Sequence, residues 1–514
     1  MRFLVFLFLG LWAVPVSAAP VGAVYTKHCA ECHGAERLGG IGPALLPQNL
    51  KRLKKKAATA VIRDGREATQ MLGFSEVLSE ADVEALVAYI YTPLDNVPGW
   101  GMDDIAASRI VHTEMSELAD APQHNADPLN LFTVVETGDH HVTILDGDKF
   151  EPLWRFKSRF ALHGGAKYSP DGRFVYLGSR DGWVSKYDLW SFKPVAEVRA
   201  GINMRNIAVS SDGKWIMAGN YLPHTITILN AHDLTPFRVI EAKDKQGNSS
   251  RVSAVYNAPP RKSFIAAFKD IKQIWEMSYD PDAAPVYEGF VHNYREGQEE
   301  GIITEPQPFA RKRIKLDVYL DDFFFDSEYT DVMGASRDGK SAVYNLDARR
   351  KVSDLDLDGM PHLGSGIIWD YGGREVMATP HLRGGTISVI DMESWKTIKR
   401  IKTMGPGFFM RSHDNTPYAW VDVFFGPNKD KLHVIDKRTL EIVKTITPEP
   451  GKTGAHVEFT RDGKYALVSI WDMDGALVVY DAATLEEVKR IPMKKPSGKY
   501  NVFNKITYSR GTSH

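Results

Sequence analysis

The sequence predicts two domains of different fold class: a small all-α domain at the N-terminus and a large all-β domain over most of the remaining chain of 514 residues. Helical periodicity fades after about residue 125, and short alternating apolar segments then recur to the C-terminus. Asp-Gly or similar turns separate these segments, which is the pattern of β-hairpins. The β pattern itself repeats in eight units, and such a repeat predicts an eight-bladed β-propeller.

Residues 1–18 have the pattern of an export signal. Met1 and Arg2 give a positive start, residues 3–16 are almost wholly apolar, and Val16-Ser17-Ala18 is a small-residue cleavage signature. The apolar run is shorter than the roughly 20 residues of a membrane span, and an uncleaved anchor is the alternative. No later run is long enough to cross a bilayer. We therefore expect a periplasmic mature protein without an integral membrane segment.

The charge balance narrows the class of partner. Formal net charge is only −2, and 25% of the residues are charged. A nucleic-acid-binding chain favours a basic stripe or patch. We expect no nucleic-acid partner.

Both cysteines of the chain lie in Cys29-Ala30-Glu31-Cys32-His33. In an oxidising compartment a Cys-x-x-Cys pair could be a redox dithiol. The histidine directly after the pair instead indicates c-type haem attachment. The thiols of Cys29 and Cys32 would bond the porphyrin vinyl groups, and the His33 imidazole would bind the iron. The motif predicts one covalent haem c.

Residues 19–97 continue as a small helical domain. A Gly/Pro-rich loop is followed by a loop that carries Met71, and then by an amphipathic helix that begins with a capping-box-like pattern at Ser79. This order resembles a class I cytochrome c domain. The resemblance makes Met71 the sixth iron ligand, with His28 as the alternative. A methionine ligand raises the reduction potential, which suits electron acceptance.

Residues 98–124 are expected to be a linker, and residues 125–514 the propeller. The repeat is clearest at Tyr168, Val209 and Phe459, and weaker copies begin at Leu131, Ala254, Asp322, Gly366 and Arg411. The fifth copy is delayed, so residues 280–315 look like an insertion. Seven blades, or an array of two-sheet sandwiches, are the alternatives.

Histidines and arginines recur near the starts of these repeats. The histidines are His163, His362, His381, His413 and His456, and the arginines in similar loops are Arg180, Arg205 and Arg383. Each histidine alone is better explained as a structural residue, and for each arginine a solvated surface position is an equal alternative. Together they can converge on the mouth of the propeller channel, where histidine suits an iron ligand or an acid/base. Arginine there can bind carboxylates bidentately.

The chain resembles the cytochrome cd1 group over nearly its whole mature length. The specific stretches are Ser179-Arg180-Asp181-Gly182, Pro361-His362-Leu363-Gly364, Thr379-Pro380-His381-Leu382 and Lys499-Tyr500-Asn501-Val502. The resemblance implies a c-type domain joined to an eight-bladed propeller that holds haem d1 or dihydro-haem d1 without a covalent bond. It makes His163 the proximal ligand of that iron. Arg180, Arg205, His381 and Arg383 would then contact the tetrapyrrole.

The resemblance leaves two activities and a carrier in competition. Nitrite reductases of the group use two distal histidines. His362 matches one, but Asp321 stands where the other is expected. The chain looks more like the branch that completes haem d1 synthesis by oxidising a propionate of dihydro-haem d1 to an acrylate. A related biosynthetic protein lacks the c-type domain, so the haem c motif speaks against it. A haem d1 carrier without catalysis is the third possibility.

For the oxidation, the resemblance implies a base, an electron sink and a recipient of the product. We expect His456 to be the first base, because the reductases carry Lys/Arg-type residues around that stretch, and His362 to be the second. Tyr500 is expected as a distal contact or proton partner. Haem c would pass electrons to a periplasmic acceptor, and a nitrite reductase would receive haem d1.

Overall fold

The computed structural model describes residues 20–508, except 41, 52, 67–70, 287–306, 337–338 and 358. The expected export signal, residues 1–18, lies outside the described residues. The chain forms two compact units, Met1–Asp95 and Asn96–His514. No helix in the described part of the chain combines the length and the hydrophobicity that crossing a membrane requires.

The first unit is helical. Its helices are α1 (Val21–His28), α2 (Ala30–His33), α3 (Pro47–Leu50), α4 (Lys55–Asp64) and α5 (Glu80–Ile90). Helix α5 begins with the predicted capping box: the Ser79 hydroxyl accepts from the Asp82 amide, and the Asp82 carboxylate accepts from the Ser79 amide. Such a cap stabilises a helix by about 1 kcal/mol. Tyr25 of α1 is fully buried and packs against Tyr89 of α5.

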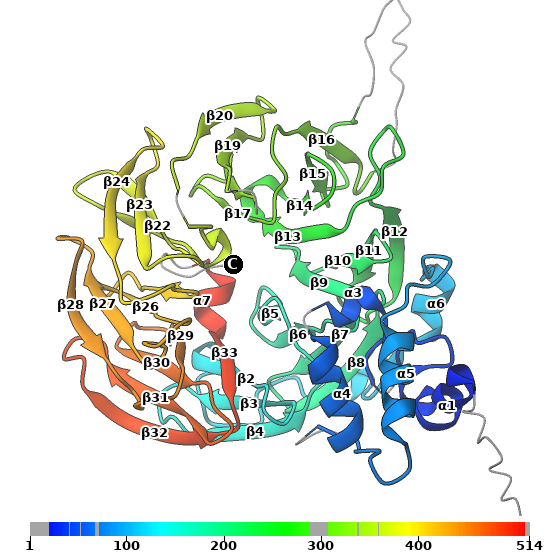
Figure 1. Cartoon of the computed structure of the whole chain (residues 1–514). Coiled ribbons are helices and arrows are strands. Elements are labelled where there is room, and N and C mark those ends of the chain that lie inside the picture. The colour runs from blue at the N-terminus through cyan, green and yellow to red at the C-terminus, as the bar shows by residue number, and fades with distance from the viewer. Residues whose placement is uncertain are drawn as a thin grey trace, which may run out of the picture. The chain divides into compact units, whose positions relative to one another are not determined.

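The second unit is an eight-bladed β-propeller in the described residues, as predicted (Figure 1). From the innermost strand outward, blade 1 holds β33 (Pro496–Asn501), β2 (Leu131–Glu136), β3 (His141–Asp146) and β4 (Pro152–Lys157); blade 2 holds β5 (Lys167–Tyr168), β6 (Phe174–Gly178), β7 (Trp183–Asp188), β8 (Lys193–Arg199) and β1 (Ile110–Val111). Blade 3 holds β9 (Asn203–Val209), β10 (Trp215–Leu222), β11 (Thr225–Asn230) and β12 (Pro236–Glu241); blade 4 holds β13 (Val252–Ala258), β14 (Ser263–Phe268), β15 (Gln273–Ser278) and β16 (Arg311–Lys315).

The other four blades follow the same order. Blade 5 holds β17 (Asp322–Phe325), β18 (Asp331–Ala335), β19 (Ser341–Asn345) and β20 (Arg350–Asp354); blade 6 holds β21 (Ile367–Asp370), β22 (Glu375–Pro380), β23 (Thr386–Asp391) and β24 (Thr397–Lys402). Blade 7 holds β25 (Met410–Arg411), β26 (Tyr418–Asp422), β27 (Leu432–Asp436) and β28 (Glu441–Ile446); blade 8 holds β29 (Gly454–Phe459), β30 (Tyr465–Ile470), β31 (Gly475–Asp481) and β32 (Glu487–Met493). Each predicted repeat corresponds to one blade.

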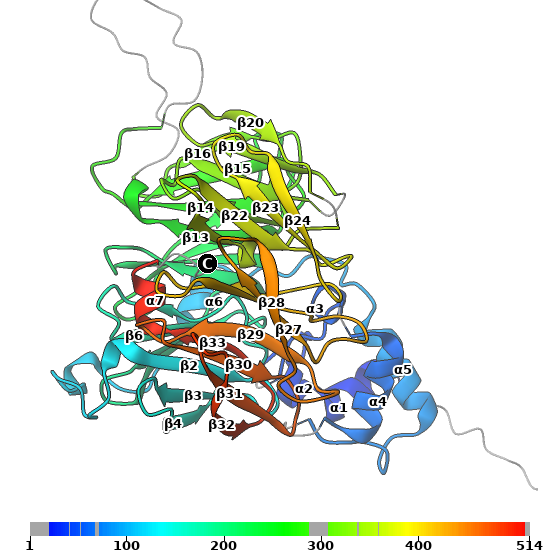
Figure 2. The same ribbon diagram turned by 90° about the vertical axis from the view of Figure 1, so that its left-hand side faces the viewer.

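The ring is closed by the C-terminal strand. β33 pairs with β2, with Thr133 opposite Tyr500 and Val134 opposite Lys499. Blade 1 is therefore built from both ends of the unit. Helix α7 (Val502–Ile506) follows β33 and crosses the middle of the ring (Figures 1 and 2).

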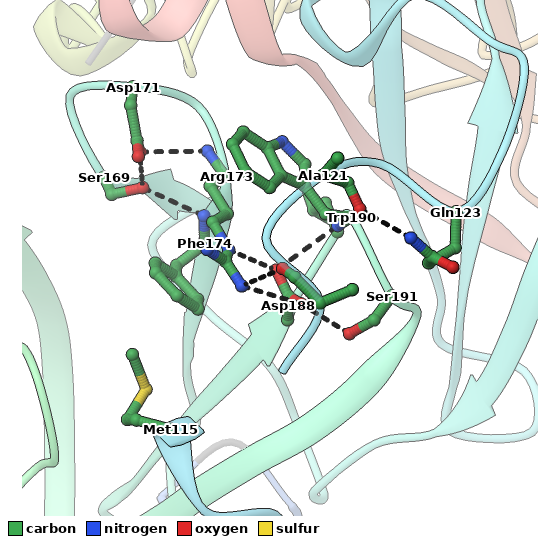
Figure 3. A network of polar contacts seen from close by, with 12 residues as sticks. Met115, Ala121, Gln123, Ser169, Asp171, Arg173, Phe174, Asp188, Trp190 and Ser191 are labelled. Atoms are coloured by element: carbon green, nitrogen blue, oxygen red, sulfur yellow. Dashed lines mark hydrogen bonds and ion pairs between the residues drawn. The ribbon is translucent and has the colours of Figure 1, made fainter. Parts of the chain in front are cut away.

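The Asp-Gly turns explain the strongest sequence repeats. In blade 2 the Ser169 hydroxyl donates to Asp171 and accepts from the Phe174 amide at 2.9 Å, while Gly172 has φ +75° (Figure 3). A positive φ at this point of a turn favours glycine. The turns at Asp212-Gly213 and Asp462-Gly463 repeat this geometry.

Polar contacts lock the second hairpin of blade 2 as well. Asp188, at the end of β7, accepts from Arg173 Nε at 2.9 Å and from the Ser191 hydroxyl (Figure 3). The carboxylate is fully buried. A buried charge is tolerated only when it is paired and hydrogen bonded, and the Arg173 guanidinium supplies both.

Two segments outside the repeat are also structured. Residues 98–124, expected as a linker, contain α6 (Met102–Ala107) and β1, and β1 pairs with the outer strand β8. The expected insertion, 280–315, ends before Arg311, since β16 is the outermost strand of blade 4. Residues 287–306 lie outside the described part.

Candidate functional site

The Cys-x-x-Cys-His segment is arranged to hold a haem. His33, at the end of α2, is only 8% exposed, and its Nδ1 lies 2.8 Å from the Pro43 carbonyl oxygen. That oxygen accepts the Nδ1 proton, so Nε2 is left to bind a metal. A side chain on Gly42 would come within 2.7 Å of the imidazole, so glycine is needed there. Burial lowers the pKa of His33, which keeps the ring neutral as a ligand must be.

The environment of Cys29 argues against a redox dithiol. Burial and the neighbouring Cys32 raise the pKa of the Cys29 thiol to about 11. Reactive Cys-x-x-Cys motifs show the opposite shift, because the attacking thiol must be a thiolate. Cys29 is the N-cap of α2, and Cys32 lies within α2 directly before His33. These residues fit covalent haem c.

Met71 lies in a loop tied to the end of α4. Its carbonyl accepts from the Arg66 amide at 2.9 Å, and it packs against the same buried cluster as Cys29 and Phe74. This position is compatible with the predicted role as sixth ligand, which stays a prediction. The alternative, His28, ends α1 with its ring 6.0 Å from that of Phe74.

The propeller brings most of the predicted histidines and arginines to one end of its channel. In every blade the start of the innermost strand and the end of the second strand meet at the same edge, because the two are antiparallel. The residues at this edge are His163, Arg180, Arg205, His362, His381, Arg383 and His456. We call this edge the open end.

His163 and two arginines form the first group at the open end. His163 Nδ1 is 2.7 Å from the Arg205 carbonyl oxygen, so Nε2 is the acceptor atom. Arg180 Nη2 and Arg205 Nη1 lie 2.9 Å and 2.8 Å from Nε2. The atom that would bind iron is thus surrounded by two guanidinium groups that suit the carboxylates of a tetrapyrrole.

Further positive charge surrounds Tyr221, at the end of β10. Burial raises the pKa of Tyr221, but Arg205, Lys269 and Arg180 outweigh it and bring the pKa below the usual value. Lys269 was not singled out from the sequence. Lys269 follows β14 in blade 4, and no local sequence pattern places it beside Arg180 of blade 2 or Arg205 of blade 3.

Asp321 is ion-paired. Its carboxylate binds Lys269 Nζ, and the Lys269 side chain is only 5% exposed. The aspartate that stands in place of the expected distal histidine is therefore one half of an ion pair with Lys269. It does not supply the imidazole that a distal histidine would offer.

His362 is held as a neutral imidazole. Its Nδ1 lies 2.7 Å from the Phe408 carbonyl oxygen and its ring 4.3 Å from that of Phe408. Burial lowers the pKa of His362, although Asp322 acts in the opposite direction. The Nδ1 hydrogen bond leaves Nε2 as the atom able to take a proton.

His381 and Arg383 are placed differently. His381 is fully buried behind the segment that carries His362, with Pro361 and His381 bridged in a short β-contact. Arg383 has an exposed side chain in the turn after β22. His413 lies away from the open end, against Gly463 of an Asp-Gly turn, and its Nδ1 accepts from the Asn415 amide.

His456 is the most confined of the predicted residues. It is 2% exposed and occupies a bulge of β29 with φ +48°, which turns its ring out of the blade. Its Nδ1 is 3.4 Å from Lys499 Nζ, and its Nε2 has no hydrogen-bond partner among the described residues. Burial, then Lys499 and Arg411, hold the pKa of His456 well below its ordinary value. A buried imidazole nitrogen without a partner fits a bound ligand.

Aromatic rings connect the two histidines. The Phe409 ring lies 6.1 Å from His362 and 4.7 Å from His456. Tyr500, on β33, packs 5.4 Å from His456 on another side. Burial raises the pKa of Tyr500 to about 12, so it stays a phenol and can donate a hydrogen bond.

Asp422 fixes the backbone around His362 and His456. This buried carboxylate, at the end of β26, accepts from the amides of Phe408, Phe409 and His456 at 2.7, 3.0 and 3.1 Å. It links the loop beneath His362 to the bulge of His456. Burial raises the pKa of Asp422 to about 6. The sequence did not predict the role of Asp422, because several other strands of the repeat also end in aspartate and nothing local distinguishes this one.

Comparisons with known proteins agree with this arrangement. The family model "Cytochrome D1 heme domain" matches residues 126–287 and 282–505, and "Cytochrome C oxidase, cbb3-type, subunit III" matches residues 17–90. Dihydro-heme d1 dehydrogenase of Pseudomonas aeruginosa is 55% identical over 96% of both chains. Nitrite reductase of Stutzerimonas stutzeri is 24% identical, over 94% of this chain and 92% of its own.

A solved structure of dihydro-heme d1 dehydrogenase NirN in complex with DHE has the same architecture. It is 55% identical, with a TM-score of 0.88 over 95% of this chain and all of the solved chain. The match includes both units, so it extends well beyond a shared propeller. The chain therefore belongs to the cytochrome d1 haem domain family, with dihydro-heme d1 dehydrogenase as a full-length relative.

Proposed function

We propose that the chain oxidises one propionate side chain of dihydro-haem d1 to an acrylate and so completes haem d1. The proposal has two supports. The full-length relative is a dihydro-heme d1 dehydrogenase, and the open end carries two neutral imidazoles, the buried His456 and the half-buried His362. The observation that carries the proposal is His456, whose buried Nε2 has no partner among the described residues. A base of this kind is what removal of a proton from carbon requires.

The substrate is bound through its iron and its carboxylates. His163 Nε2 takes the iron, because the carbonyl of Arg205 already holds Nδ1. Arg180 and Arg205 then bind carboxylates of the substrate, because a planar guanidinium can donate two hydrogen bonds to one carboxylate. The covalent haem c of the first unit is bound by Cys29, Cys32 and His33.

The oxidation turns a CH–CH bond into a C=C bond and releases two protons and two electrons. His456 Nε2 accepts a proton from the side chain, and the Tyr500 hydroxyl donates a hydrogen bond to the carboxylate end of that side chain. His362, whose Nε2 is unprotonated, is the second candidate base. Haem c, when bound, accepts electrons one at a time and passes them to an external acceptor. His456 must be neutral to act, and its burial ensures this.

The cellular setting follows from the same reaction. The export signal expected at residues 1–18 directs the protein to the periplasm, where c-type haem and haem d1 are used. A nitrite reductase is the recipient of the product, and a periplasmic redox protein is the electron acceptor. The pairing of Asp321 with Lys269 disfavours nitrite reduction by this chain itself.

Binding is tested with His163→Ala. The variant is titrated anaerobically with dihydro-haem d1 and followed by absorption, with the wild-type protein alongside. Loss of the axial nitrogen is expected to weaken binding and alter the tetrapyrrole bands. An unchanged affinity and spectrum would show that another residue binds the iron.

A further inference from the structure

A cavity lies on the side of the propeller ring away from the open end. The cavity has a volume of about 430 Å³. It is lined by the last residues of the innermost strands, such as Tyr168, Val209 and Phe325, and by α7, which crosses the ring in Figure 1. The open end lies at the starts of these strands. Site and cavity are thus at opposite ends of one channel.

Two lysines face this cavity from deep within the molecule. Lys167 on β5 and Lys505 on α7 line it, and both keep some accessible surface there. Burial, helped by Arg411, lowers the pKa of Lys167 to about 8 and that of Lys505 well below its ordinary value. Burial therefore makes both amines easier to deprotonate than exposed lysines.

A buried carboxylate joins the cavity to the site. Glu458 is 1% exposed and lies two residues after His456 on β29. Its Oε1 accepts from Asn504 Nδ2 at 3.2 Å, and Asn504 lines the cavity. Its Oε2 has no hydrogen-bond partner among the residues that the structure describes. A buried oxygen in this state marks a place for water or a transferred proton.

Lys499 completes the connection to His456. This lysine is fully buried on β33, with Nζ 3.4 Å from His456 Nδ1 and 2.9 Å from the Ser469 hydroxyl. Burial holds the pKa of Lys499 well below its usual value, with Glu458, Arg411 and Asp422 as the charges that act on it. A neutral amine there can accept the Nδ1 proton of the imidazole.

We propose that the proton removed from the substrate leaves through the propeller channel, by way of His456, Lys499, Glu458 and Lys505, into the cavity at the far end. This route rests on the proposed function and deepens it. Nε2 of His456 takes the substrate proton and Nδ1 gives one to the Lys499 amine. Lys499 passes a proton to Glu458, and Lys505 delivers it to cavity water. Each of the two protons that the oxidation releases leaves in this way, and the two electrons would pass one at a time through haem c to the external oxidant, so charge and atoms balance.

The test is a single turnover with proton release followed directly. Full-length protein with its haem c is loaded anaerobically with dihydro-haem d1, ferricyanide starts the oxidation, and a pH-indicator dye reports protons in weak buffer. In the wild type, proton release and the absorption change of the macrocycle coincide. In Glu458→Gln both slow by about 10²-fold, the lower end for loss of a positioned proton-transfer group. Glu458→Asp restores most of the rate, because it keeps a carboxylate.

Glu276→Gln is the matched control. Glu276 is a similarly buried carboxylate, paired with Arg261 and Lys312 at 2.8 Å in blade 4, away from the route. The Glu276→Gln variant should release protons at the wild-type rate. If Glu458→Gln no longer binds substrate, Lys505→Met takes its place with the same expected slowing. A wild-type rate of proton release in Glu458→Gln or Lys505→Met would overturn the proton route but leave the proposed function intact. A wild-type protein that forms no haem d1 would overturn the proposed function, and the route with it.

Discussion

At the scale of single residues, the backbone sets the chemistry of His456. His456 lies in the bulge of β29 with φ +48°, and Asp422 holds the bulge by accepting from the His456 amide. Left-handed φ values are uncommon outside glycine and are kept where surrounding structure enforces them. The ring therefore enters a pocket of Phe409, Tyr500 and Lys499 in one orientation.

His456→Gln is expected to retain binding but lose conversion. Glutamine keeps a polar group of similar reach, yet it cannot take a proton. Loss of a general base typically lowers the rate about 10²- to 10⁴-fold. Conversion of bound dihydro-haem d1 is measured after binding has been confirmed by titration. Normal conversion by a variant that still binds would remove His456 from the mechanism.

The pKa of His456 also predicts the shape of the pH profile. Burial holds that pKa well below 6.5, so the neutral base persists as the pH falls through 6.5. The rate limb that reports this base should therefore lie on the acid side of 6.5. The same shift predicts how the free energy of unfolding depends on pH. Below pH 6.5 the unfolded chain protonates His456 while the folded protein does not, so the folded protein becomes less stable as the pH falls.

Met71→Ala tests the sixth ligand of haem c. Removing the thioether should abolish the near-infrared iron–sulfur charge-transfer band of the oxidised protein, because no sulfur then faces the iron. Attachment through Cys29 and Cys32 should persist, so the haem remains covalent in denaturing gels. A band of unchanged intensity would assign the position to another residue.

The haem c residues could be predicted from the sequence because their chemistry is contiguous, and their role stays a prediction. Cys29, Cys32 and His33 form one motif, and the structure places them around one turn of helix. Lys269, Asp422 and Lys499 were not predicted, because their contacts cross between blades. Such contacts depend on how neighbouring blades pack together, and no local sequence pattern predicts this packing.

At the scale of elements, the strand pattern was predictable and the ring closure was not. Ser-x-Asp-Gly and Thr-x-Asp-Gly turns mark the first hairpin of three blades, and each turn uses the same hydroxyl, carboxylate and glycine. β33 carries no such turn. Its partner, β2, lies more than 300 residues earlier in the chain.

Deleting residues 494–514 is expected to open the ring. Blade 1 loses its innermost strand, β2 becomes an unpaired edge, and the site loses Lys499 and Tyr500. The loss should be comparable to the roughly 5–15 kcal/mol stability of a whole domain. Thermal unfolding should show a much less stable propeller that no longer binds the tetrapyrrole. The haem c spectrum should be retained, since its ligands lie in the other unit; a normal propeller transition would contradict this account of closure.

At the scale of the whole molecule, fold class and family were predictable, and electrostatic detail was not. Asp321 stands where nitrite reductases of the group have a second distal histidine. The structure pairs it with Lys269, so repulsion of nitrite is weakened while the missing proton donor remains. The expected outcome is unchanged: steady-state nitric oxide production should be far below that of a dedicated nitrite reductase assayed in parallel. Comparable production would assign the chain to that activity.

The most direct test is the anaerobic conversion of dihydro-haem d1 by purified full-length protein carrying its haem c. Substrate is bound in stoichiometric amount, an external oxidant is added, and the extracted tetrapyrrole is identified by absorption and mass. We predict a product two mass units lighter, haem d1, with two electrons consumed per tetrapyrrole, and far slower conversion by His456→Gln. Tetrapyrrole recovered unchanged from protein that binds it tightly would contradict the account and identify the chain as a carrier.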